Sequence, residues 1–136
     1  MNVEIIYNSP FATLWYYPES KIIHHQTHLQ KGSWQPDEFR QIMLLGSQTL
    51  EEKGAQKWLS DDRNTIGASK EEFQWGKEFW FPATIKRGWK HWAIVQPKDI
   101  IAQLNMEKAV KDYKSQGINA QFFTEVEEAM KWLESQ

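Results

Sequence analysis

The feature of this 136-residue chain that most constrains its fold is a change in the spacing of its apolar residues. Residues 21–29 divide into two alternating sets, with Ile23 and His25 in one and Ile22 and His24 in the other, and this period of two is typical of a half-buried strand. From Pro36 onward, stretches with apolar residues three and four positions apart, the spacing of one helix face, are separated by short apolar runs. The sequence therefore predicts an opening β-hairpin followed by alternating helices and strands.

Turn and cap signals give approximate bounds to these elements. Strands are expected at residues 3–7, 11–17, 21–29, 57–61, 91–95 and 118–123, and helices at 36–53, 69–87, 100–116 and 125–136. A hairpin followed by strand–helix–strand units makes a mixed sheet with helices packed against it. The predicted fold class is α/β, with a single mixed sheet flanked by about four helices over residues 1–136.

The second expected helix contains a proline. Pro82 removes a backbone donor and predicts a kink or break near Trp80 and Phe81. We expect Phe79 and Trp80 to supply much of the apolar surface of this helix, together with Phe73 and Ile85.

Composition narrows the class of protein. A chain of 136 residues with 40% hydrophobic and 25% charged residues fits one globular domain. The absence of cysteine excludes disulfides and thiolate chemistry, and a net charge of −2 argues against nucleic acid as a partner. No phosphate-loop, dinucleotide or metalloprotease motif occurs, so we expect no cofactor.

The chain start carries no basic region followed by a long apolar run. No stretch is long and apolar enough to cross a bilayer, so we expect no membrane insertion and a cytoplasmic location.

Tryptophan is unusually frequent. The eight tryptophans are Trp15, Trp34, Trp58, Trp75, Trp80, Trp89, Trp92 and Trp132. Large aromatic side chains stabilise small cores, and they also line ligand pockets and interfaces. Most are expected to be packing residues, and the alternative is that two or more line a functional cleft.

Two adjacent carboxylates follow one expected strand. Asp61 or Asp62 could act as a general base in a cleft lined by tryptophan. Neighbouring residues of a strand point to opposite faces, so a pair sharing one proton is not expected. The simpler interpretation is a polar turn in which Arg63 pairs locally, with no catalytic residues.

Three histidines lie in the third expected strand. His24 and His28 share a face but are about 13 Å apart on an extended chain, too far to hold one metal ion, and His25 faces the other way. We therefore expect no metal site.

Three segments together resemble a known family. Residues 57–64, 80–88 and 93–99, in this order of elements, are similar to small bacterial proteins of the SpoIIAA-like group, which is related to STAS domains. The resemblance implies a regulatory switch in which a serine or threonine at a helix start is phosphorylated. The corresponding positions are Ser69 or Thr65, although residues 66–70 read Ile-Gly-Ala-Ser-Lys where the family has Asp-Ser-Ser/Thr-Gly.

The resemblance and the residues give three hypotheses. The first is a non-enzymatic regulatory or binding module, acting on a protein partner or a small apolar ligand through a surface formed by Asp61, Arg63, Ser69 and Trp75. The second is an enzyme that uses Asp61 or Asp62. The third is a self-associating structural protein, for which the surplus of aromatic residues makes a homodimer plausible.

Overall fold

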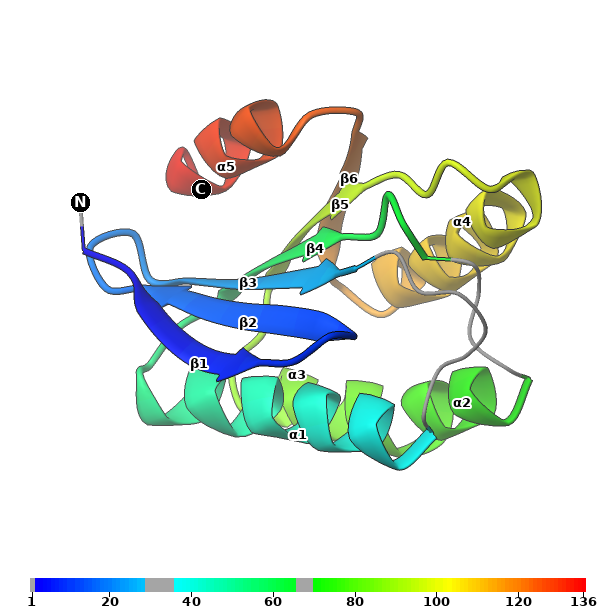
Figure 1. The fold of residues 1–136 in the computed structure, drawn as a ribbon, viewed down its shortest axis with the longest axis horizontal. Coiled ribbons are helices and arrows are strands. Elements are labelled where there is room, and N and C mark those ends of the chain that lie inside the picture. The colour runs from blue at the N-terminus through cyan, green and yellow to red at the C-terminus, as the bar shows by residue number, and fades with distance from the viewer. Residues whose placement is uncertain (1, 29–35, 66–69) are drawn as a thin grey trace.

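The computed structural model describes residues 2–28, 36–65 and 70–136 (Figure 1). Its centre is one six-stranded sheet in which the strands lie in chain order. These strands are β1 (Glu4–Asn8), β2 (Ala12–Tyr17), β3 (Ile22–Thr27), β4 (Lys57–Asp61), β5 (His91–Val95) and β6 (Asn119–Phe123). The first three strands pair antiparallel, and β3 to β6 pair parallel, which confirms the predicted mixed sheet.

The helices fall into four segments along the described chain. They are α1 (Pro36–Glu52), the continuous stretch α2 (Lys70–Trp75), η1 (Gly76–Trp80) and α3 (Phe81–Lys86), then α4 (Ile100–Ser115) and α5 (Val126–Glu134). Figure 1 shows α5 on one face of the sheet and α1 and α3 on the other. The predicted α/β class and its element order are confirmed.

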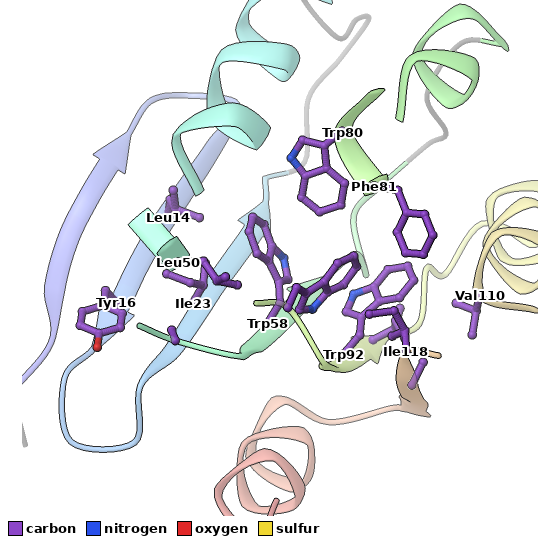
Figure 2. Close-up of a cluster of buried hydrophobic side chains, with 14 residues drawn as sticks. Leu14, Tyr16, Ile23, Leu50, Trp58, Trp80, Phe81, Trp92, Val110 and Ile118 are labelled. Atoms are coloured by element: carbon purple, nitrogen blue, oxygen red, sulfur yellow. The ribbon is translucent and has the colours of Figure 1, made fainter. Parts of the chain in front are cut away.

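Each face of the sheet has its own apolar core, because successive strand residues point to opposite faces. Beneath α5, Leu59 and Val95 pack against Ala129 and Leu133. The opposite core is larger and rich in aromatic side chains, and α1, α3 and α4 contribute to it. Figure 2 shows the side chains of Trp58, Trp80, Phe81 and Trp92 gathered in this second core.

The helical stretch before Pro82 widens into a π-helical turn at η1. The backbone N–H of Phe81 donates to the carbonyl of Gly76, five residues earlier. Consecutive helix residues point to different sides, and here Trp80 is 4% exposed while Phe79 is 64% exposed. The expected role of Phe79 as apolar packing surface was therefore wrong, and the predicted irregularity near Trp80 takes the form of a π turn.

The close packing of α1 on the sheet depends on Gly46. A Cβ atom added there would overlap the indole Cη2 of Trp58 and lie 2.9 Å from its Cζ3. Since Trp58 is 1% exposed and surrounded by other rings, it has little freedom to move.

We predict that Gly46→Ala lowers the free energy of unfolding. Overpacking costs about 1–3 kcal/mol, which exceeds the gain of up to about 1 kcal/mol from alanine in a helix. Chemical denaturation monitored by circular dichroism measures the difference.

Gly76→Ala is the matched control, because its added Cβ would meet only the Tyr113 hydroxyl at 3.8 Å. This variant should be as stable as wild type or more stable. Equal destabilisation of both variants would contradict the steric explanation.

Candidate functional site

A partly open cavity of about 120 Å³ lies where the carboxyl ends of β3 and β4 meet the helices. We call it the aromatic cavity, because rings make up much of its wall. Its described lining consists of His25, Phe39, Met43, Trp58, Ser60, Asp62, Thr65, Glu72, Phe73, Trp75, Gly76, Trp80, Trp92, Pro97, Ala102, Met106, Ala109 and Tyr113. In open α/β sheets ligands gather at the carboxyl ends of the parallel strands, which is where this cavity lies.

Two of the tryptophans in the wall, Trp80 and Trp92, are held by hydrogen bonds from their indole N–H groups to other lining residues. The Trp80 ring lies edge-on to Trp58 with centroids 5.4 Å apart, and its indole N–H donates to the Met43 carbonyl at 2.7 Å. The Trp92 indole N–H donates to Ser60 Oγ at 2.9 Å. With these donors satisfied inside the protein, the rings provide a pre-formed apolar wall.

One end of the cavity is polar, and parallel strand pairing builds it. His25 on β3 lies directly beside Ser60 on β4, and Asp62 follows two residues later on the same side of the chain. We call His25, Ser60 and Asp62 the polar end of the aromatic cavity. The Asp62 backbone N–H bonds to the Val95 carbonyl at 3.1 Å, which ties this residue to β5.

Asp62 is a buried carboxyl group with weak hydrogen bonding. Its side chain accepts a long hydrogen bond of 3.4 Å from the Thr65 hydroxyl, and the residue is 6% exposed. Burial, with a smaller contribution from the charge of Asp61, raises the pKa of Asp62 from 3.8 to about 7. The carboxyl group is therefore balanced between its neutral and ionised forms near neutral pH.

His25 is 5% exposed, and within the described segments no side chain is hydrogen-bonded to its ring. Burial, chiefly, and then the neighbouring His24 lower the pKa of His25 to about 4. It is thus a neutral imidazole at physiological pH, with one nitrogen able to donate and the other able to accept a hydrogen bond.

A second carboxylate, Glu72, lines the cavity but is already paired. Arg40 binds it through Nε at 2.9 Å and Nη2 at 3.2 Å. The same guanidinium lies over the Trp75 ring, 5.2 Å from the centroid. This arrangement holds Glu72 and Trp75, two residues of the cavity wall, in place through one guanidinium that does not itself line the cavity.

The described residues of the binding surface predicted from sequence do not all belong to the aromatic cavity. Asp61 and Arg63 form a two-pronged ion pair, with both guanidinium–carboxylate distances at 2.9 Å, as the simpler interpretation of this turn predicted. Neither residue is among those that line the aromatic cavity, whereas Trp75 is. Ser69 lies outside the described residues.

The other face of the sheet holds His24. Its ring lies between Trp15 and Tyr17, with centroids at 4.6 and 5.9 Å, and the Tyr17 hydroxyl is 3.1 Å from Nδ1. His28 is 2.7 Å from the Thr13 hydroxyl. Among residues 2–28, 36–65 and 70–136, no three histidine or acidic side chains form a group suited to a metal ion.

Sequence reasoning missed His25 and Ser60 as site residues. The available signal was positional, since both lie near the carboxyl end of a strand on the face that carries Trp58. Using it required the register between β3 and β4, which the sequence does not fix.

No family model, curated protein or solved structure matches this chain. In the described part of the chain no helix combines the length and apolar character needed to cross a membrane.

We predict that Asp62→Asn stabilises the protein above neutral pH. The folded pKa of about 7 lies above the usual 3.8, so the unfolded chain releases this proton first and wild-type stability falls as pH rises from about 4 to 7. Asparagine removes this loss, on the order of 2–4 kcal/mol at pH 8. The variant and wild type should converge near pH 4, as urea denaturation across this range would show.

Asp61→Asn is the matched control at the neighbouring position. It weakens a bidentate ion pair with Arg63 and should lower stability at pH 8. If Asp62→Asn were no more stable than wild type at pH 8, the burial of an ionisable carboxyl at this site would be wrong.

Proposed function

We propose that this domain is a non-enzymatic binding module that takes a small, largely apolar molecule into the aromatic cavity. The observation that supports this most directly is a pre-formed cavity with an aromatic wall and a small polar end. Both features are typical of ligand sites, where apolar walls contribute affinity and a few polar groups orient the ligand.

The size of the cavity limits the ligand. A cavity of about 150 Å³ holds a benzene molecule, so the 120 Å³ found here favours a compact molecule of about one ring or fewer than ten non-hydrogen atoms. A longer molecule would need an end outside the cavity.

The polar end distinguishes this cavity from a packing defect. Empty cavities in protein cores are usually apolar, because a buried polar group without a partner is costly. Here His25 and Asp62 both line the cavity, and the hydrogen bond that Thr65 donates to the Asp62 carboxyl is long, at 3.4 Å. A ligand with complementary polar atoms would satisfy both groups.

A regulatory role of the STAS-like type fits this proposal. Ligand occupancy between the sheet and α4 could be sensed by a protein partner at the adjoining surface. Phosphorylation of Ser69 stays a prediction, and mass spectrometry of the protein from its native cells would test it.

A second candidate function is catalysis by Asp62. A carboxyl group whose pKa is raised to about 7 by burial is suited to accept a proton from a bound substrate. Asp61 is excluded from this role by its ion pair with Arg63 and its position outside the cavity lining. Turnover of a bound ligand, abolished by Asp62→Asn with binding retained, would favour catalysis over binding alone.

Intrinsic tryptophan fluorescence tests the binding proposal, since Trp58, Trp75, Trp80 and Trp92 line the cavity. We expect a screen of compact, mainly apolar compounds to give a saturable change in emission. Ala109→Leu adds a side chain from α4 toward the cavity and should weaken binding about tenfold or more.

Glu107→Leu is the matched control, because it adds the same side chain at an exposed position of α4. It should leave affinity unchanged. Equal affinity in Ala109→Leu and wild type would show that the compounds bind elsewhere.

A further inference from the structure

We infer that the ligand of the aromatic cavity is a small organic cation, an alkylated ammonium compound whose counter-ion is the carboxylate of Asp62. This inference rests on the proposed binding function and adds the charge and chemical class of the ligand.

The charge of the cavity lining favours a cation. Asp62 and Glu72 contribute carboxylates, and no lysine or arginine occurs among the described residues that line the cavity. The base present, His25, is neutral because burial lowers its pKa to about 4. Glu72 is paired with Arg40, so an anionic ligand would meet the Asp62 carboxylate with no lining cation to compensate it, whereas a cation would be attracted to Asp62.

The aromatic wall of the cavity also favours a cation. Aromatic faces carry a negative electrostatic potential and attract alkylated ammonium groups, with tryptophan the strongest. Four tryptophans and Tyr113 surround this cavity. The Arg40 guanidinium already makes a contact of this kind with the Trp75 ring, and the same guanidinium is paired with Glu72.

The two carboxylates of the lining differ in how far their charges are compensated. Glu72 has two hydrogen bonds from Arg40, so its charge is largely compensated. Asp62 has one 3.4 Å contact with a neutral hydroxyl and is more than nine-tenths buried against the cavity. Asp62 is therefore the group that gains most from a cationic ligand, and ion pairing would return the carboxylate to its charged form.

Proton release should accompany binding. The titratable groups around Asp62 are Asp61, paired with Arg63, and across the cavity His25, Glu72 and Tyr113. His25, with a pKa of about 4, and Tyr113, whose pKa burial raises to about 12, both stay neutral between pH 6 and 8. Over this interval the change in affinity should follow Asp62.

The test uses choline and its neutral carbon isostere, in which carbon replaces the quaternary nitrogen. Isothermal titration of the full chain at pH 8 should give at least tenfold tighter binding of choline. At pH 6 choline should bind about tenfold more weakly than at pH 8, because ionised Asp62 is then the minor form, and the isostere should be unaffected.

Two variants distinguish the effect of the Asp62 charge from the effect of the aromatic wall. Asp62→Asn should lose the preference for choline and its pH dependence while still binding the isostere. Trp75→Leu keeps an apolar wall but removes one aromatic face, and should reduce the preference several-fold.

The outcomes distinguish the two proposals. Binding of the isostere and of choline with equal affinity would overturn the cation inference and leave the apolar binding site in place. Binding of neither compound at millimolar concentration would overturn the cation inference, and a blank screen of neutral compounds would overturn the binding function as well. A choline preference that survives in Asp62→Asn would show that Asp62 is not the counter-ion.

Discussion

The parallel pairing of β3, β4 and β5 is the constraint on which the rest of this structure depends. It places Trp58 beside Trp92 and His25 beside Ser60, so residues far apart in the chain share one face of the sheet. A shift of one residue in either pairing would send these side chains to the opposite face. The aromatic core and the polar end of the cavity are therefore products of the same register.

The order of elements along the chain and the helix positions follow from local patterns, and they were predictable for that reason. The apolar run of β5 and the helical spacing in α1 each depend on burial of one or both faces. The half-buried strand expected at β3 was wrong, because β3 is buried on both faces, with His24 6% and His25 5% exposed. The separation of Asp61 and Asp62 was also predictable, because it follows from the period of a strand. The cavity was not, since it depends on how α2 and α4 lie across the strand ends, which no local pattern specifies.

Tryptophan frequency was informative about the core and ambiguous about the site. Trp58, Trp80 and Trp92 are each less than 10% exposed and pack against other rings, yet the same three line the cavity. Burial and site formation are therefore not alternatives in this protein. The number of tryptophans alone cannot distinguish a packing residue from a cavity-lining residue. A ring whose edge packs in the core can still present part of its surface to the cavity.

The π turn at η1 sets the position of Trp75 and Glu72 in the wall of the aromatic cavity. A five-residue spacing between Gly76 and Phe81 amounts to one residue more than a regular helical turn would use. Removing a single residue here would restore the ordinary α-helical repeat and rotate everything N-terminal to it by about 100° relative to α3. Trp75 and Glu72 would then both move away from the cavity. Deletion of a single codon would thus remove this part of the cavity wall without changing the sheet.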